Sequence, residues 1–322
     1  MLKLKTLLVA ALAAISLNAA AQNWPQRPVR FILSLGAGSG ADIGARLYTD
    51  RLTKIWGQPA VVENRPGGDG VIAINAVIAA RDDHVFLWGP TANFVGHPYT
   101  LDQMPYDAKE LLPVARVSGT VVTLAVPASM NVGSLKEFLG QAKEQSGKMN
   151  WATAVTMTDI ILEGFLKSSG IDMAHARYKD TVSAVNDLME NRIQLYSSAY
   201  AIVRAQAQQG GKVKLLAVQA RNRVPGLDLP TVGELGFHGL DFEGLVGIVA
   251  ARSSNLPDAA KDRIGADIKT VSKDPLVAER LAATAQLNVP GNAAEFAQSI
   301  DEQVKQLADS AKRLGLKPKA VQ

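Results

Sequence analysis

The chain has 322 residues and no cysteine, which excludes disulfides, zinc–thiolate sites, iron–sulfur clusters and cysteine nucleophiles. Lys and Arg number 34 against 30 Asp and Glu, so the formal charge is only +4. No basic run is interleaved with aromatic residues, and we therefore expect no nucleic-acid partner. Apolar residues make up 47%, which excludes intrinsic disorder, and the length allows two domains of about 150 residues.

The first residues have the composition of an export signal. Lys3 and Lys5 precede an apolar run over 7–17 that is too short to span a bilayer, and small residues follow at 19–21. We predict a signal peptide over 1–21, cleaved after Ala21, with a membrane anchor or a buried helix as the alternative. Losing the two lysines lowers the formal charge from +4 to +2. Since no cysteine follows the apolar run, we expect a periplasmic protein without a lipid anchor.

After residue 28, strand-like and helix-like segments alternate. Short apolar runs predict strands, and apolar residues at helical spacing predict the helices between them. This order is typical of an α/β fold with a parallel sheet. The predicted strands are 29–34, 60–62, 85–88, 121–126, 149–152, 173–176, 195–197, 213–218 and 245–250, and the predicted helices are 42–56, 71–80, 135–145, 158–168, 183–190 and 201–209.

A last helix is predicted near the C-terminus from one apolar stripe. Its members recur three or four residues apart, and we interpret them as core packing: Phe296, Ile300, Val304, Leu307, Ala311 and Leu314.

A glycine-rich turn between the first strand and the first helix is the most informative segment. It contains Gly36, Ala37, Gly38, Ser39, Gly40, Ala41 and Asp42. Glycines let backbone amides approach a ligand, and a helix N-terminus favours an anion. The turn therefore predicts a site for a carboxylate-like anion, with Asp42 as a candidate helix cap.

Other interpretations of this turn compete with an anion site. Gly36, Gly38 and Ala41 satisfy a dinucleotide fingerprint, and Glu63 ends the second predicted strand, but an exported protein has no free NAD available. No Gly-Lys-Ser/Thr closes a phosphate loop, and Ser39 does not lie in a nucleophile elbow. A tight turn without a ligand remains the alternative.

A second turn of this kind follows the strand at 149–152. It is rich in hydroxyls and small residues, and its candidate ligand-binding residues are Thr153, Ala154, Val155, Thr156, Thr158 and Asp159. Two helix N-termini facing one cleft would hold a small anion from both sides. The alternative is that Thr158 or Asp159 only caps its helix.

The histidines show no metal-ligand spacing, so no metal site is predicted. His84 and His175 flank predicted strands and are expected to be surface or hydrogen-bonded structural residues. No spacing marks an activated nucleophile with its base, and no enzymatic activity or cofactor is predicted.

Several segments resemble the Bug-type solute receptors of tripartite tricarboxylate transporters, over essentially the whole chain after residue 23. The matching segments are W-P-Q-R-P-V-R at 24–30, the glycine turn ending in Ala41-Asp42, V-E-N-R-P-G-G at 62–68, M-P-Y-D at 104–107, Y-K at 178–179 and L-P-T-V-G-E-L-G at 229–236.

The resemblance implies a periplasmic receptor with two α/β lobes joined by two crossing strands. The lobes are expected over 24–120 with 247–322, and over 121–246. The ligand would be a small organic acid, the partners the membrane permease subunits of a transporter, and the receptor itself a monomer. The carried-over ligand residues lie in 34–42, beginning at Ser34, and in 153–159, with Thr91, Asn93, Ser198 and Tyr200 lining the same cleft.

The sequence departs from the family pattern in the first turn, where Ser34 and Gly36-Ala37 stand at positions where prolines are common, in and just after the second turn, and at Ser198. Val155 and Met157 stand where glycines are usual, Ile161 where a histidine is usual, and Ser198 where an acid is usual. These changes favour a monocarboxylate or an apolar or aromatic acid over an amino acid. A secreted hydrolase and a ligand-sensing subunit of a signalling system are the alternative functions.

Overall fold

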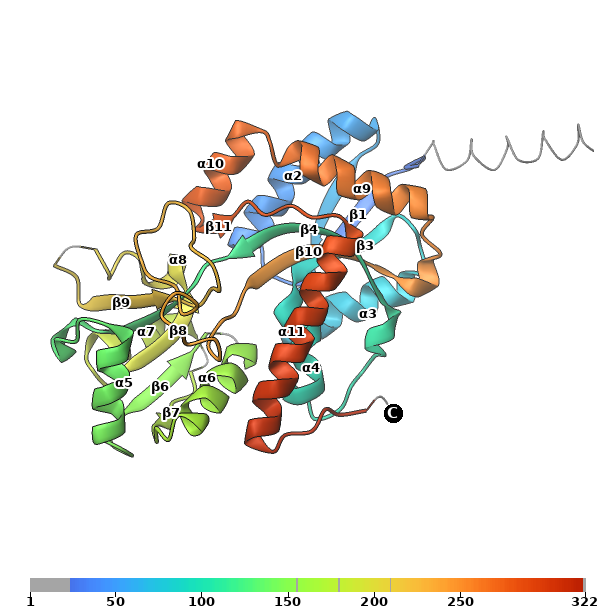
Figure 1. Ribbon diagram of the computed structural model, residues 1–322. Helices are drawn as coiled ribbons and strands as arrows, with labels where there is room; N and C mark the ends of the chain where they lie inside the picture. The colour runs from blue at the N-terminus through green and yellow to red at the C-terminus, as the bar shows by residue number, and fades with distance from the viewer. Residues whose placement is uncertain (1–23, 155, 179, 209, 321–322) are drawn as a thin grey trace, which may run out of the picture.

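The computed structural model describes residues 24–154, 156–178, 180–208 and 210–320; the predicted signal peptide lies outside them. The strands form two sheets, each flanked by helices (Figure 1). The first sheet has the order β11-β4-β10-β3-β1-β2. Its strands are β1 (Val29–Leu33), β2 (Ala60–Asn64), β3 (Val85–Pro90), β4 (Leu111–Thr120), β10 (Gly244–Ala251) and β11 (Gln286–Leu287).

The pairing of the first sheet is mixed. β1 lies between β2 and β3 and is parallel to both, as predicted. β10 is antiparallel to β3 and β4, so the parallel order predicted for the first three strands does not extend over the whole sheet. The chain returns to this sheet after completing the second one, which places β10 beside β3.

The second sheet has the order β7-β6-β8-β5-β9. β6 is parallel to β7 and β8, whereas β5 is antiparallel to β8 and β9. Its strands are β5 (Val122–Pro127), β6 (Asn150–Thr153), β7 (Ala174–His175), β8 (Leu195–Ala199) and β9 (Val213–Val218).

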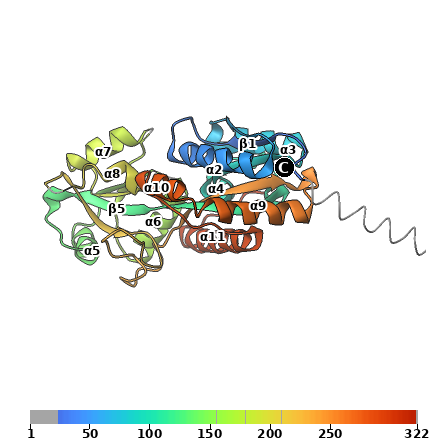
Figure 2. The same ribbon diagram turned by 90° about the horizontal axis from the view of Figure 1, so that it is seen from above.

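Helices cover both faces of each sheet. On the first sheet, α2, α9 and α10 pack on one face and α3, α4 and α11 on the other (Figure 1). On the second, α5 and α6 lie opposite α7 and α8 (Figure 2). The bounds are α2 (Gly40–Trp56), α3 (Val71–Ala80), α4 (Thr91–Thr100), α5 (Leu135–Glu144), α6 (Thr156–Ser168), α7 (Thr181–Met189), α8 (Tyr200–Val203), α9 (Asp258–Val271), α10 (Pro275–Ala283) and α11 (Ala293–Leu314), with short 3-10 helices η1 (Gly68–Gly70), η2 (Ala108–Glu110), η3 (Ala128–Met130) and η4 (Arg252–Ser254).

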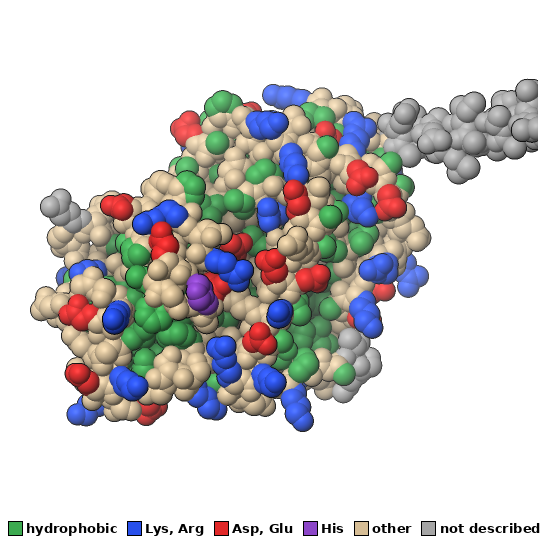
Figure 3. Space-filling model, in the orientation of Figure 1, with side chains coloured by type: hydrophobic (Ala, Val, Ile, Leu, Met, Phe, Trp, Pro, Cys, Tyr) green, Lys and Arg blue, Asp and Glu red, His purple; other side chains and the backbone are tan. Residues whose placement is uncertain are grey.

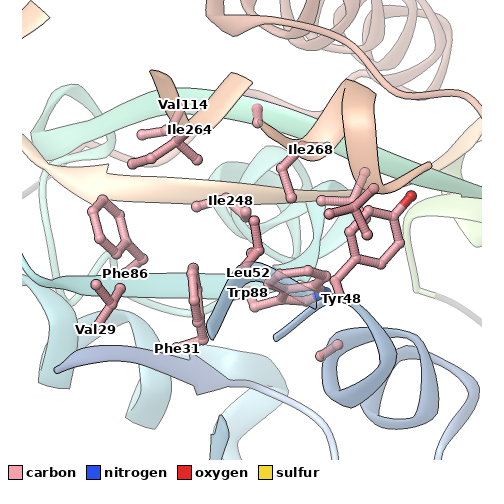
Figure 4. Close-up of a cluster of buried hydrophobic side chains, with 14 of the residues drawn as sticks. Val29, Phe31, Tyr48, Leu52, Phe86, Trp88, Val114, Ile248, Ile264 and Ile268 are labelled. Atoms are coloured by element: carbon pink, nitrogen blue, oxygen red, sulfur yellow. The ribbon is translucent and has the colours of Figure 1, made fainter. Parts of the chain in front are cut away.

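The core of the first lobe is built around β1, β3 and β10. Figure 4 shows Phe31, Phe86 and Trp88 from neighbouring strands beneath Ile264 and Ile268 of α9. The Phe31 ring meets Trp88 edge to face with centroids 5.3 Å apart, a favoured geometry for aromatic pairs. This packing fixes the positions at which β1 and β3 end.

The C-terminal stripe is core packing with one exception. Phe296, Leu307 and Ala311 are fully buried, and Ile300 and Leu314 are partly buried. Val304 is 47% exposed, so its assignment to the core is wrong; the neighbouring Gln303 is buried instead.

Some elements differ from the prediction. The helix expected over 201–209 is one turn long, because α8 ends at Val203 and turns follow. α4, β4, α9 and α10 are not predicted from the sequence. β4 contains Pro113 and pairs with β10 through two register shifts, which removes the simple alternation of a strand.

Two connections pass between the sheets, and they lie side by side. One runs from β4 through Val121 into β5. The other enters β10 from Phe242, whose amide donates to the carbonyl of Gln219 at 2.9 Å. Thr120 and Gly244 pair across the two connections. The predicted two-lobed α/β fold is confirmed.

Lysine, arginine, aspartate and glutamate side chains are interspersed over the face shown in Figure 3. No helix within the described part of the chain is both long and apolar enough to cross a membrane.

Candidate functional site

A cavity of about 300 Å³ lies between the two sheets. It opens at the carboxyl ends of β1 and β3 in the first sheet and of β6 and β8 in the second. In α/β proteins, ligands bind at such strand ends. The lining residues are Leu35, Asp69, Pro90, Ala92, Asn93, Gly96, Thr100, Thr120, Val122, Ala154, Met157, Ala199, Phe242, Gly244 and Leu245.

Both connections between the sheets contribute to this cavity. Thr120 and Val122 come from one connection, and Phe242 and Gly244 from the other. A second cavity of about 310 Å³ shares these residues but extends toward Arg223 and away from the two predicted turns. The first cavity is therefore the candidate ligand site.

The first turn is held by its own side chains. The Ser39 hydroxyl accepts from the Asp42 amide at 3.2 Å, so Ser39 and not Asp42 caps α2. The Asp42 carboxylate instead accepts from the Gly38 amide at 3.0 Å. The amides of Gly36 and Ala37 have no described acceptor, so this turn keeps donors for an anion.

Asp42 is 3% exposed and surrounded by donors. Arg46 donates to it at 3.1 Å, and Asn64 donates at 2.9 Å. Burial raises the pKa of Asp42, but the hydrogen bonds from Arg46, the Gly38 amide and Asn64 outweigh burial and leave the pKa below its ordinary value. Asp42 is thus an ionised group that shapes the turn, and its charge is already neutralised.

The second turn has a comparable arrangement. The Thr153 hydroxyl donates to Asp159, which is in the first turn of α6. His175 Nε2 lies 3.4 Å from the same carboxylate. Thr158 is buried. Val155 lies outside the described residues, as does the side chain of Thr156.

The remaining predicted residues separate into three groups. Asn93 and Ala154 line the cavity. Thr91 is fully buried, and its hydroxyl donates to Gln303 Oε1 at 2.6 Å, which ties α4 to α11. Tyr200 lies in a different hollow with Leu227.

Ser34 and Ser198 are buried next to the strand ends. Their hydroxyl oxygens and Asn93 Oδ1 lack a hydrogen-bond partner within the described structure. A buried polar group without a partner is costly, and a ligand or an ordered water that satisfies it recovers that free energy.

Two polar residues near the cavity are not singled out from the sequence. Asp69 lines the wall, and His97 lies beneath it, fully buried, with Nε2 2.9 Å from the Asp69 carbonyl. An acid inside a run of glycines is the sequence signal that marks Asp69. Met157 lines the cavity as its apolar character indicated, whereas Ile161 is buried in the core.

The other histidines have structural surroundings. His84 is buried and lies 2.7 Å from Asp83, within a group of Asp82, Asp83 and His84 whose acids pair with Arg27. Arg27 donates hydrogen bonds to both acids of this group and offsets part of their negative charge. His175 stacks on Trp151 with ring centroids 3.8 Å apart. The structural role predicted for His84 is confirmed.

A receptor family matches most of the chain. The profile described as "Tripartite tricarboxylate transporter family receptor" covers residues 44–316. The chain belongs to this family. Members of the family are solute receptors, and the resemblance to Bug-type receptors is confirmed.

Relatives and solved structures agree with this membership. The chain is 29% identical to a UPF0065 protein of Bordetella bronchiseptica, over 98% of this chain and 94% of that one. The periplasmic binding protein BugD is 25% identical with a TM-score of 0.69, covering 92% and 100% of the two chains. A further fold neighbour, described as R. palustris Rpa4515 with adipate, has a TM-score of 0.76 at 22% identity, covering 92% and 99%.

Proposed function

We propose that this family member is a periplasmic receptor that binds a small organic carboxylate in the cavity between its lobes and delivers it to the permease subunits of a transporter. The observation that carries this proposal is the cavity at the carboxyl ends of the strands, next to a turn with unused amides. The fold neighbour described with adipate supports a carboxylate as the ligand class.

The chemistry of the wall fits such a ligand. No lysine, arginine or histidine is among the described residues that line the cavity, so the described donors for a ligand carboxylate are backbone amides and uncharged groups. The candidate groups lie next to the lining and not in it. The amides of Gly36 and Ala37 follow the lining residue Leu35 in the chain, and the buried hydroxyls of Ser34 and Ser198 belong to residues that precede Leu35 and Ala199. Apolar residues such as Met157 and Phe242 fit a hydrocarbon body.

Binding would shift an equilibrium between open and closed forms without a chemical step. The moving parts are the predicted lobes, 24–120 with 247–322 and 121–246, and the hinge is the pair of connections at Val121 and Phe242. Since both connections line the cavity, a bound ligand contacts the hinge directly. The permease subunits would recognise the closed form of an exported, monomeric receptor from which residues 1–21 have been removed.

Calorimetry with the mature chain tests the proposal. The panel contains adipate, hexanoate, benzoate, aspartate and glutamate, so that dicarboxylates, apolar and aromatic monocarboxylates and amino acids are all present. Ala92→Leu places three further carbons in the cavity wall and should weaken the binding of the tightest acid at least tenfold, about 1.4 kcal/mol. Ala79→Leu, at an exposed position of α3, is the control. Equal affinity of both variants, or no binding of any acid, would contradict the proposal.

A further inference from the structure

Asp69 has an unusual backbone conformation in the cavity wall. It lies in a run from Gly67 to Gly70 in which all four residues have positive φ, and its own φ is 52°. The three neighbours are glycines, which adopt this region freely, whereas a side chain there is uncommon. Where glycine would be the unstrained choice, the chain has a carboxylate, and a backbone outlier of this kind indicates a functional constraint.

Contacts with α4 hold Asp69 in place. Asn93 Nδ2 donates to Asp69 Oδ1 at 2.7 Å, and His97 Nε2 donates to the Asp69 carbonyl at 2.9 Å. The other ring nitrogen of His97, Nδ1, lies 2.5 Å from the Tyr106 hydroxyl, so the ring is held at both of its nitrogens. Hydrogen bonds to both the backbone and the side chain therefore hold Asp69 in place.

Asp69 is the one ionisable residue among the described residues that line the cavity. Its side chain is 45% exposed, and the nearest described cation-capable group to Oδ2 is His97 at 3.6 Å. Beside it, Asn93 Oδ1 is buried without a described partner. This end of the cavity thus offers two oxygen acceptors and one negative charge, the opposite of what a carboxylate requires.

We propose that Asp69, supported by Asn93, determines specificity by selecting carboxylates that also have a hydrogen-bond donor, either a hydroxyl or an ammonium group. The carboxylate binds at the turn amides, and the donor meets Asp69 and Asn93. This inference rests on the proposed function and deepens it. It also replaces the expectation that the missing acid at Ser198 disfavours a ligand with an ammonium group. An acid that could bind such a group is present at Asp69, on the other lobe.

Calorimetry with matched acids tests the inference on the mature chain. One series is hexanoate, 6-hydroxyhexanoate, 6-aminohexanoate, 2-hydroxyhexanoate, 2-aminohexanoate and adipate; the other is benzoate, 4-hydroxybenzoate, 4-(aminomethyl)benzoate and terephthalate. At least one hydroxy or amino acid should bind about tenfold more tightly than its unsubstituted parent and than the dicarboxylate, because a hydrogen bond to a charged acceptor strengthens binding by that order. An ammonium preference that exceeds the hydroxyl preference identifies the charge of Asp69 as the main contribution.

Two variants separate the role of the side chain from that of the fold. Asp69→Asn removes the charge in a residue that tolerates positive φ, and Asp69→Gly removes the side chain and relieves the backbone. Both should bring the affinity for the substituted acids to within about twofold of the affinity for the parent acid. Asp50→Asn, at an exposed position of α2, controls for the loss of one charge.

The outcomes distinguish the two proposals. If the parent acids bind as tightly as every substituted acid, or if both Asp69 variants keep the preference, the inference about Asp69 is wrong and the carboxylate receptor stands. If no acid of either series binds, the receptor proposal fails, and the inference fails with it.

Discussion

The carboxylate of Asp42 accepts a hydrogen bond from the backbone amide of Gly38, 3.0 Å away across the first turn. Gly38 has φ 81°, a conformation in which glycine is unstrained. The helix N-terminus therefore already contains one anion, supplied by the chain itself. In the receptor that we propose, a ligand carboxylate would use other amides of this turn, such as those of Gly36 and Ala37, while Asp42 holds the turn through the Gly38 amide.

Asp42→Asn is expected to destabilise the fold by about 1–3 kcal/mol, because Arg46 and the Gly38 amide lose a charged, buried acceptor. Urea unfolding at pH 7 measures the change. Asp50→Asn on the exposed side of the same helix should shift stability by less than about 0.5 kcal/mol. Equal effects of the two variants would show that the hydrogen bonds to Asp42 contribute nothing.

The contribution of Asp42 should also depend on pH. Its pKa in the folded chain is below the ordinary value of 3.8. The stabilisation is then fully present above the unfolded pKa and is lost as the pH falls through the folded pKa. The stability difference between the wild type and Asp42→Asn should be constant from pH 7 to about pH 5 and shrink below about pH 4. A difference that stays constant down to pH 3 would assign the effect to packing.

Thr91→Val is expected to cost stability without changing ligand affinity. The buried Thr91 hydroxyl donates to Gln303 Oε1, and its removal leaves that oxygen unpaired in the core, at a cost of about 1–3 kcal/mol. Thermal unfolding and calorimetry on the same preparation separate the two readouts, and Thr91→Ser, which keeps the hydroxyl, is the matched control. Weaker binding by the folded Thr91→Val variant would place the hydroxyl in the ligand site.

Local patterns predict much of this fold. The helix over 71–80 is recovered without error, because its apolar residues and its glycine-rich start are local features. β10 is found as a strand, but its antiparallel place between β3 and β4 depends on contacts far apart in the sequence. For the same reason, the exposure of Val304 beside the buried Gln303 cannot be read from helical spacing: Gln303 is buried because it bonds to Thr91 and to the Glu243 carbonyl.

The candidate site is predicted unevenly by the sequence. Glycines and hydroxyl residues in the sequence locate the turns. The sequence does not predict that Ser39 caps α2 while Asp42 accepts from the Gly38 amide, because both residues are good helix caps and only the structure shows which one does so. Thr91 and Asn93 are two residues apart, and only the structure shows that one is buried and the other lines the cavity. Asp69 is recognised as a candidate site residue only through its hydrogen bonds with His97 and Asn93, which are far from it in the sequence and lie on α4.

The final prediction concerns Gly164, where α6 meets α11. A Cβ at Gly164 would lie 3.1 Å from the Ser310 carbonyl oxygen, so the neighbouring helix must shift by a few tenths of an ångström even for a methyl group, and by more for a larger side chain. α6 also contributes Met157 to the cavity wall. Gly164→Val should therefore destabilise the fold by about 1–3 kcal/mol and also weaken the binding of the tightest carboxylate.

Urea unfolding gives the first effect and calorimetry the second. Gly140→Ala on the exposed side of α5, where a Cβ meets no atom within 4 Å, should instead stabilise by about 0.5–1 kcal/mol and leave binding unchanged. If Gly164→Val loses stability but binds with wild-type affinity, the contact between α6 and α11 supports the fold alone. If affinity falls with stability, this contact couples the packing between the lobes to the ligand cavity.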